Sequence, residues 1–500
     1  MYSFVNKLIQ NKFYILHFTF YILLILTFSS CSNSTESNKG NLSGVINLEN
    51  MEDHSGIVVA VYDLAILDTT IVRINNEYPQ IGVHINQHTE FDHRLQPPLY
   101  KTTTNASGSF EIKDITTGTY NIVAIKDGWG FKYITDYSIG KGDNSIQNVT
   151  LFSQQFFSGV IDQDLVFETD HHYIIEDDTE VRPNNSVIIQ PGSIIRINPG
   201  VDFTINCSFS AQGEENNMFW VTSNDGFTEP LTIDDEIEIY NSFVLSSVAS
   251  VPEEVIEWGK WDYANIAYLN NLPNITFNNS LYYKNKIGIS SLTQDSTFCK
   301  NSIFANNSLI GLNYYNNIQG KIEKNIFLEN NTACEVKHRF CGTIENNNFS
   351  NNETGCHMWS FHGSILHNDF KYNSVNDIKF VGNNDNIPNQ FNVTRNIFSN
   401  GFGLYHVTPG SSYGDISQLN INHNNFENSM FFIKYYSSLI DNPINMQFNF
   451  FNGFDNLTQI FEKIKDINNQ DISYDLIIIE PYETTLIQNA GIKLGNKYLN

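Results

Sequence analysis

Short apolar stretches alternate with polar turns through the second half of the chain, and a phenylalanine recurs about every 21 to 28 residues. The apolar positions lack the three- or four-residue spacing that marks an amphipathic helix. A repeat of this length, built from short strands, indicates a solenoid whose coils stack on one another. The recurring residues are Phe277, Phe304, Phe327, Phe349, Phe370, Phe398, Phe426 and Phe451.

Six of these phenylalanines end an Asn-x-Phe triplet, which repeats with the same period. An inward column of phenylalanines lets each ring stack on the next. A column of asparagines at the turns lets side-chain amides hydrogen-bond from coil to coil. We therefore expect these residues to be structural. The asparagines of the triplets are Asn325, Asn347, Asn368, Asn396, Asn424 and Asn449.

The segment before the repeat, 187–205, places short apolar strands between two Pro-Gly turns. Together with the Asn-x-Phe repeats, it resembles the first coils of a right-handed parallel β-helix, and we assign this domain to residues 157–485. At its end, Asp455 is placed to cap a helix with apolar positions Leu457, Ile460, Phe461 and Ile464. We expect this helix and a strand at 476–479 to cover the last coil, which would otherwise expose unpaired strand edges. A tail follows at 486–500.

Residues 42–151 form a separate module with clear strand alternation, as in Phe110/Ile112 and Tyr120/Ile122. Its stretch Thr104-Asn-Ala-Ser-Gly-Ser-Phe, followed by Gly118-Thr-Tyr, resembles the carboxypeptidase regulatory-like, transthyretin-like β-sandwich family. The resemblance implies a non-catalytic spacer or binding module, as is common near the N-terminus of Bacteroidota surface proteins. The whole fold is therefore expected to be all-β, a sandwich followed by a solenoid.

An insertion at about 64–100 interrupts the family pattern of this module. Histidines four residues apart on one helix face would suit a metal, but Val83, Ile85 and Thr89 favour strand or loop. We expect a polar loop and assign no metal site. The polar residues of the insertion are His84, His88, Glu90, Asp92 and His93.

The N-terminus has the pattern of an export signal, because Lys7 and Lys12 precede an apolar run at 13–28 and Cys31 follows. This pattern resembles a bacterial lipoprotein signal, in which the cysteine carries the lipid. A transmembrane anchor is the alternative, but the run is short for one. The expected organisation is a signal peptide at 1–30, lipidation at Cys31 and a tether at 31–41. It implies an outer-membrane lipoprotein on the periplasmic or cell-surface face, held by its lipid anchor.

The chain is strongly acidic, with 28 Lys and Arg against 54 Asp and Glu and a formal net charge of −26. Such a surface repels phosphate backbones, so we exclude a nucleic-acid partner. The cysteines after Cys31 have no CxxC spacing, which argues against structural zinc. Cys334 and Cys356 each follow their phenylalanine by seven residues and should stack in adjacent coils. A column of buried thiols is favoured over a disulfide.

Outward positions on the strand after each phenylalanine are the candidates for function. Alternation turns Cys334, Val336, Cys356, Met358, Ile378 and Phe380 inward and leaves their neighbours facing solvent. A one-residue slip in register would reverse every one of these assignments. The expected outward residues are Tyr314, Glu335, Lys337, Arg339, His357, Trp359, Asp377, Lys379, His406, Lys434 and Tyr436.

Aromatic, basic and acidic side chains on one face indicate a sugar-binding groove, because rings stack on sugars and charges recognise carboxylate or sulfate groups. We expect a surface protein that binds a polysaccharide. One alternative is a polysaccharide lyase with Lys337, Arg339 and His357 as base and neutralising groups, possible Ca²⁺ as its only cofactor, and Glu335 and Asp377 as cation ligands. A glycoside hydrolase using Glu335 and Asp377 is less favoured, since two coils would separate these carboxylates.

A purely structural or adhesive surface protein is the remaining possibility. Convergence of the Glu, Lys, Arg and His side chains within hydrogen-bond reach would favour the enzyme. A flat aromatic strip would favour binding.

Overall fold

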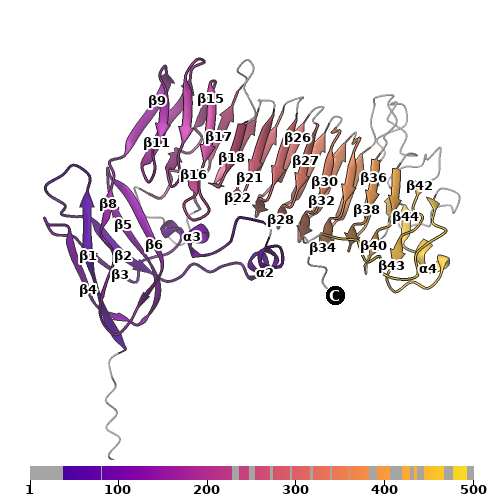
Figure 1. Ribbon diagram of the computed structural model, residues 1–500, viewed down its shortest axis with the longest axis horizontal. Coiled ribbons are helices and arrows are strands. Elements are labelled where there is room, and N and C mark those ends of the chain that lie inside the picture. The colour runs from indigo at the N-terminus through magenta and orange to yellow at the C-terminus, as the bar shows by residue number, and fades with distance from the viewer. Residues whose placement is uncertain are drawn as a thin grey trace, which may run out of the picture.

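The computed structural model describes residues 38–492 except 80, 228–235, 247–253, 271–273, 293–295, 316–318, 338–339, 360, 382–390, 406–418, 428–432, 436–443 and 467–476. Within this part, a β-rich N-terminal module precedes a long parallel β-solenoid of the right-handed type (Figure 1). The solenoid makes about 10 turns between residues 155 and 451. The expected all-β fold class is confirmed.

The N-terminal module contains two four-stranded sheets that enclose one apolar core. Core residues such as Val59, Phe110 and Ile122 come from both sheets and are the inward positions of the alternating strands. The first sheet holds β1 (Lys39–Leu48), β4 (Ser109–Thr116), β7 (Gly142–Ser145) and β8 (Val149–Leu151). The second holds β2 (Val58–Tyr62), β3 (Tyr100–Thr103), β5 (Gly118–Lys126) and β6 (Gly130–Ile139).

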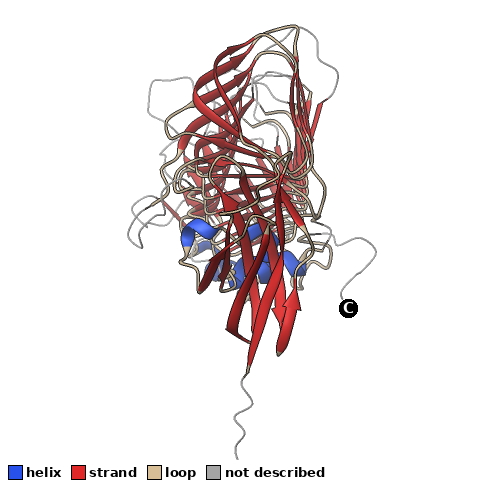
Figure 2. Ribbon diagram, turned by 90° about the vertical axis from the view of Figure 1, so that its left-hand side faces the viewer, coloured by secondary structure: helices blue, strands red, loops and turns tan. Residues whose placement is uncertain are grey.

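Each full coil of the solenoid contributes one strand to each of three parallel faces, here named A, B and C. The view from the N-terminal side shows that strands form the wall of the solenoid (Figure 2). The first strands, β9 (Gln155–Ile161) and β11 (His172–Val181), bend across faces B and C, because each half of β11 pairs with a different strand.

Face A contains β10 (Leu165–Phe167), β12 (Ser186–Ile189), β15 (Ser208–Gln212), β18 (Glu254–Glu257), β21 (Ile275–Asn278), β24 (Thr297–Lys300), β27 (Gly320–Glu323), β30 (Thr343–Glu345), β33 (Ser364–Leu366), β36 (Phe391–Thr394), β39 (Leu419–Asn422), β42 (Ile444–Asn445) and β45 (Ile477–Ile478). Face B continues with β13 (Ile194–Ile197), β16 (Phe219–Ser223), β19 (Gly259–Asp262), β22 (Leu281–Tyr283), β25 (Ile303–Ala305), β28 (Ile326–Leu328), β31 (Asn348–Ser350), β34 (Asp369–Lys371), β37 (Ile397–Phe398), β40 (Asn425–Phe426) and β43 (Phe450–Phe451). Face C continues with β14 (Asp202–Ile205), β17 (Tyr240–Leu245), β20 (Ala264–Asn270), β23 (Ile287–Ser291), β26 (Ile310–Tyr315), β29 (Thr332–Lys337), β32 (Thr354–Trp359), β35 (Asn376–Val381), β38 (Phe402–Tyr405), β41 (Ile433–Tyr435) and β44 (Ile464–Asp466).

A stack of aromatic rings fills the solenoid behind face B. From Phe304 to Phe370 successive centroids lie 4.7–4.9 Å apart with nearly parallel planes. The stack continues through Phe451, which confirms the predicted column for seven of the eight phenylalanines. Phe277 was wrongly included: it lies on face A in register with Cys299, and Tyr282 occupies its place in the stack. The error arises because a tyrosine ring stacks as well as a phenylalanine ring.

The expected asparagine columns are present, and two of them are buried among the described residues. Between faces A and B, the Oδ1 of Asn347 accepts hydrogen bonds from the backbone and side-chain nitrogens of Asn325 at 2.9 and 3.0 Å. The same pattern continues coil by coil to Asn449. A second ladder between faces B and C includes Asn307, Asn330, Asn352 and Asn373.

The predicted cysteine column is also confirmed. Cys334 and Cys356 are in register on neighbouring strands of face C, and both are fully buried and unpaired. The other described cysteines, Cys207, Cys299 and Cys341, form no disulfide with a described residue. These thiols act as small apolar side chains in the interior, apart from Cys341, which is exposed.

The insertion in the N-terminal module is not the predicted polar loop. Residues 64–99, here named the strap, contain α2 (Thr69–Glu77), α3 (Gln87–Glu90) and a 3₁₀ turn, η1 (His93–Leu95). The strap lies along face B, beneath the solenoid in Figure 1, with Ile71 and Ile74 packed against outward apolar residues of that face. Its apolar positions were hidden in the sequence among polar neighbours.

The C-terminal end also differs in detail from the expectation. The predicted helix is shortened to α4 (Leu457–Phe461), and its cap is Asn456 rather than Asp455. Ile464 belongs to β44, and β45 (Ile477–Ile478) lies within the predicted strand at 476–479. Both strands pair with faces C and A, respectively, and so continue the solenoid rather than closing it as a separate cap.

Candidate functional site

One outward row on face C carries several of the predicted functional side chains. The pairing of β26, β29, β32 and β35 places Asn313, Glu335, His357 and Lys379 side by side on successive strands. Neighbouring strands are about 4.8 Å apart, so side chains in one row are within contact distance. The inward partners Cys334, Val336, Cys356, Met358, Ile378 and Phe380 are buried in the core, which confirms the predicted register here.

Glu335 connects two basic side chains. Its Oε1 lies 2.9 Å from Nδ1 of His357, and its Oε2 lies 2.8 Å from Nζ of Lys337. The Glu335 side chain is 8% exposed, and that of His357 is 12% exposed. The carboxylate therefore holds both partners in fixed positions in a site with little solvent.

The local charges determine the protonation of this cluster. Burial raises the pKa of Glu335, but hydrogen bonds from His357 and Lys337 outweigh burial and hold it below its usual value. Burial lowers the pKa of His357, although the hydrogen bond to Glu335 opposes this shift. His357 is then neutral near pH 7, with its proton on Nδ1 facing the carboxylate and a lone pair on Nε2.

Trp359 lies beside His357 on the same strand, with ring centroids 5.4 Å apart. Nε1 of Trp359 and Nε2 of His357 are shielded from solvent, and neither has a hydrogen-bond partner among the described residues. One atom is a donor and the other an acceptor. A hydroxyl group of a ligand that reached both atoms would relieve two unsatisfied polar groups, which is a favourable source of binding energy.

Some predicted residues fall in parts of the chain that the structure does not describe. Arg339, His406 and Tyr436 are outside the described residues. The backbone of Lys434 continues the same row, because it pairs with Gly403, which in turn pairs with Lys379. Lys465 follows on β44. The backbone register of the row therefore continues toward the C-terminal coils, with Gly403 between Lys379 and Lys434.

Tyr314 was predicted to face outward, and this is wrong. Tyr314 is in register with the inward Val336, and its ring is fully buried and stacks on Phe340 at 6.0 Å. The outward residues of that strand include Asn313, which is in register with Glu335 and whose Nδ2 donates to Ser290 at 3.3 Å. The sequence alone did not reveal the one-residue difference, which exchanges the two sides of a strand.

Asp377 was also placed on the surface, but it is completely buried. Its carboxylate accepts hydrogen bonds from Nδ2 of Asn373 at 2.9 Å and from the backbone nitrogens of Asn400 and Gly401 at 2.6 and 3.0 Å. It therefore ends the second asparagine ladder where Gly401 supplies no side chain. Burial raises the pKa of Asp377 to about 7.

A clue to this position was present in the sequence. Asp377 precedes the inward Ile378, and the equivalent residues of the preceding coils are Gly288, Gly311, Ala333 and Gly355. A Cβ atom at Gly355 would lie 2.5 Å from the carbonyl oxygen of Asp377. Such a column of small residues indicates close backbone packing beside the ladder rather than a solvent-facing position.

The site offers hydrogen-bond acceptors, cations and an aromatic ring, but no evident metal site. Among the described residues, no three His, Cys, Asp or Glu side chains are grouped to hold an ion. His84 also lies outside α3, so it does not share a helix face with His88. With Asp377 buried, the pair of carboxylates required for the proposed cation ligands or for a glycoside hydrolase is not assembled on this face.

No protein-family model matches this chain, and no curated protein matches its sequence. In the part of the chain that the structure describes, no helix is both long and apolar enough to cross a membrane. The arguments for function therefore rest on the site itself.

Proposed function

We propose that this protein binds carbohydrate along face C of its solenoid. The observation that carries the proposal is the pair formed by His357 and Trp359, flanked by Lys337 and Lys379 on the same face. An aromatic ring beside a hydrogen-bond acceptor and cations suits a sugar ring with hydroxyl groups and, in an acidic glycan, a carboxylate. The ligand would run across neighbouring coils along the row.

The sequence supports attachment of this binding surface to a membrane. We infer that Cys31 carries a lipid and that residues 31–41 form the tether of an outer-membrane lipoprotein, on the periplasmic or cell-surface face. The resemblance of the N-terminal module to a Bacteroidota spacer domain agrees with this arrangement. Metabolic labelling with a fatty-acid analogue tests it, because a Cys31→Ser variant should lose the label.

Affinity electrophoresis through gels that contain individual polysaccharides, acidic and neutral, tests binding. The protein should be retarded in at least one gel, and Trp359→Ala should abolish most of the retardation. Tyr372→Ala is the matched control, because Tyr372 is an aromatic residue with 74% exposure away from the row. If no glycan retards the protein, or if the two variants behave alike, the binding surface on face C is wrong.

A polysaccharide lyase is the second candidate, and the convergence of Glu335, Lys337 and His357 favours it. In that reaction, a movement of the site would expose Nε2 of His357, which would take the proton next to a uronate carboxylate. The electron pair would form a carbon–carbon double bond as the glycosidic oxygen leaves and takes a proton from water. Lys337 would stabilise the negative charge on the uronate. Glu335 would hold the base in the required tautomer.

The ultraviolet absorbance of the unsaturated product separates the two candidates. A lyase produces this absorbance with a uronate polysaccharide, with or without added Ca²⁺, and loses it in His357→Ala. A binding protein is retarded in the gel but produces no absorbance.

A further inference from the structure

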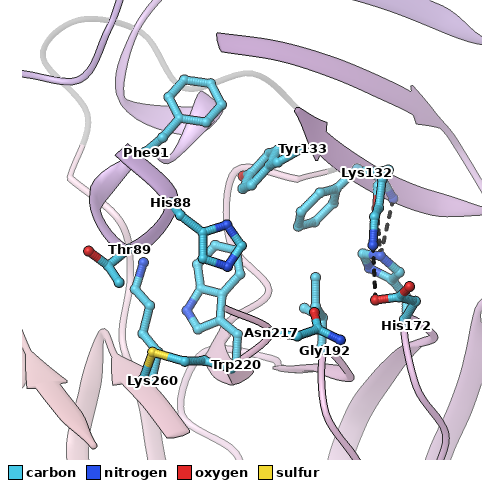
Figure 3. A pocket seen from close by; sticks show the side chains of 14 residues that line it. His88, Thr89, Phe91, Lys132, Tyr133, His172, Gly192, Asn217, Trp220 and Lys260 are labelled. Carbon is cyan, nitrogen blue, oxygen red and sulfur yellow. Dashed lines mark hydrogen bonds and ion pairs between the residues drawn. The ribbon is translucent and has the colours of Figure 1, made fainter. Parts of the chain in front are cut away.

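A cavity of about 100 Å³ lies where the strap, the N-terminal module and the first coils of the solenoid meet. His88 comes from the strap, Lys132 and Tyr133 come from β6, and Trp220 and Lys260 come from face B (Figure 3). The cavity is therefore on a different face from the row around His357. Three segments distant in sequence have to pack together to form it.

The cavity has an aromatic wall. Phe131, Tyr133 and Trp220 all line it, with centroids 4.7 Å apart for Phe131 and Tyr133 and 6.1 Å apart for Phe131 and Trp220. Nζ of Lys260 lies over the Trp220 ring, 4.5 Å from its centroid. Aromatic surfaces with polar groups at their edge are suited to ligands that carry both apolar and hydroxyl-bearing surfaces.

The charges at the cavity are balanced in pairs. Nζ of Lys132 lies 2.9 Å from the carboxylate of Asp170, and Nζ of Lys260 lies 3.4 Å from the carboxylate of Asp262. Figure 3 shows the two lysines approaching from opposite sides. Because each cation already has a carboxylate partner, the wall offers both donors and acceptors without a large net charge. Asn217 adds another amide to the lining.

The two histidines of the lining add no charge at neutral pH. Burial lowers the pKa of His172 well below its usual value, and Nε2 of this residue lies 2.8 Å from the carbonyl oxygen of Phe131. Burial also lowers the pKa of His88, and the nearby Lys260 and Lys132 lower it further. A neutral ligand is thus better matched to the cavity than an ion.

The surroundings of the cavity are fixed by contacts that do not involve a ligand. Arg94 of the strap is fully buried, pairs with Asp92 at 2.8 Å and donates to the carbonyl oxygens of Ser223 and Asp225. These contacts hold the strap against β16 beside the cavity. A preformed site loses less conformational freedom when it binds.

The volume limits the size of the ligand. A cavity of about 100 Å³ is well above the roughly 10–15 Å³ that one water molecule requires, but it is small for a binding site. This matches a single six-membered sugar ring and excludes several linked units. A longer glycan would enter only by its end.

We propose that the cavity is a second carbohydrate site, which binds one neutral sugar unit between the aromatic wall and the Lys132–Asp170 pair. The ring would pack against Trp220 and Phe131, while its hydroxyl groups would donate to Asp170 and accept from Lys132. This site does not depend on the proposed function of face C, because no residue is shared between them.

Saturation-transfer NMR on the full chain tests the proposal, with glucose, galactose, mannose and N-acetylglucosamine as probes. Asp170→Asn is the informative variant, because Asp170 has φ of 61° and asparagine tolerates this backbone conformation. It keeps the fold and removes the charged acceptor, so the dissociation constant should rise by about tenfold. Asp162→Asn is the matched control, since Asp162 is an exposed aspartate paired with Arg182.

The test should be repeated in the Trp359→Ala background, which removes the main ligand contact on face C. Binding of one probe that survives Trp359→Ala and Asp162→Asn but weakens in Asp170→Asn supports the cavity. Binding that is lost in Trp359→Ala and unchanged in Asp170→Asn overturns the cavity and leaves face C as the only sugar site. Absence of binding by all four probes also overturns it.

Discussion

The asparagine ladder and the strap both hold the solenoid together, but they do so in opposite ways. In the ladder, the same side chain makes the same hydrogen bonds in coil after coil, as Asn325, Asn347 and Asn368 show. On the strap, Arg94 and Tyr78 each make contacts that occur once. A ladder that repeats in every coil can be recognised from the periodicity of the sequence, whereas a contact that occurs once produces no periodic pattern.

The two regions also differ in what they connect. The ladder connects residues 21 to 31 positions apart, since each asparagine bonds to the adjacent coils. The strap connects residues more than 100 positions apart, such as Arg94 with Ser223. Loss of a ladder residue should therefore disturb neighbouring coils, whereas loss of a strap residue should release the N-terminal module from face B.

The largest effect is expected from a break in the ladder at Asn347. Asn347→Leu removes five hydrogen bonds of this side chain, with the two nitrogens of Asn325, the carbonyls of Ile322 and Glu345, and Oδ1 of Asn368. Each of these hydrogen bonds contributes about 0.5–1.5 kcal/mol, so the free energy of unfolding should fall by about 5 kcal/mol. Urea denaturation followed by circular dichroism measures this change.

The control for the ladder is Asn331→Leu, which makes the same chemical change at an exposed asparagine. Asn331 contacts only Glu353 through its side chain among the described interactions, so we expect a loss below about 1 kcal/mol. Equal effects of the two substitutions would show that the ladder does not stabilise the coils as the hydrogen bonds indicate.

A break in the strap at Arg94 should have the next largest effect. Arg94→Ala leaves Asp92 buried without its cation, which costs about 3–5 kcal/mol. Hydrogen exchange should increase in the strap and at 222–225, while the coils around Phe349 stay protected. Arg73→Ala is the control, because Arg73 and Glu77 form an exposed ion pair that contributes less than about 1 kcal/mol. Uniform exchange across all coils would contradict the separation between strap and ladder.

A smaller effect, dependent on pH, is expected where the second ladder ends. Burial raises the pKa of Asp377 to about 7, above its usual value of 3.8, so the folded state binds a proton more tightly than the unfolded state. This group therefore stabilises the fold most at low pH and loses that contribution as pH rises from about 4 to 7, by at most about 4 kcal/mol.

The comparison of wild type with Asp377→Asn isolates this group. The stability of the wild type relative to the variant should increase as pH falls from 7 to 4, whatever constant difference the lost hydrogen bond adds. Chemical denaturation at a series of pH values measures the relative stability. A difference that does not change with pH would show that Asp377 keeps an ordinary pKa in the fold.

The periodic features were predictable from the sequence, and the single contacts were not. The ring stack, the asparagine column and the inward cysteines follow from spacing alone, because stacked coils repeat their environments. Glu335, Lys337 and His357 came from the same register. Tyr314 was misplaced because the register of its strand differs by one residue from the expected one. Asp377 was misplaced because, at the start of its strand, its carboxylate bonds to the backbone of the adjacent turn.

The strap and its cavity were not predicted for a different reason. Ile71, Ile74 and Tyr78 become buried only because face B presents apolar partners such as Leu281 and Ile303. The strap sequence contains no repeat that indicates this partner. No metal site was assigned to its histidines, and His84 precedes α3, so it does not share a helix face with His88.

Asp369 on face B brings together the beginning and the end of the described chain. Its Oδ2 accepts from the hydroxyl of Tyr78 at 2.7 Å, and its Oδ1 accepts from the backbone nitrogen of Ile492 at 3.3 Å. Tyr78 leaves the ribosome 291 residues before its partner. N-terminal domains fold first during synthesis, so the N-terminal module has to fold before Asp369, the partner of Tyr78, has been made. The outer part of the strap then docks in the order in which translation delivers the coils, and the segment at Ile492, which is synthesised 123 residues after Asp369, completes the contact later.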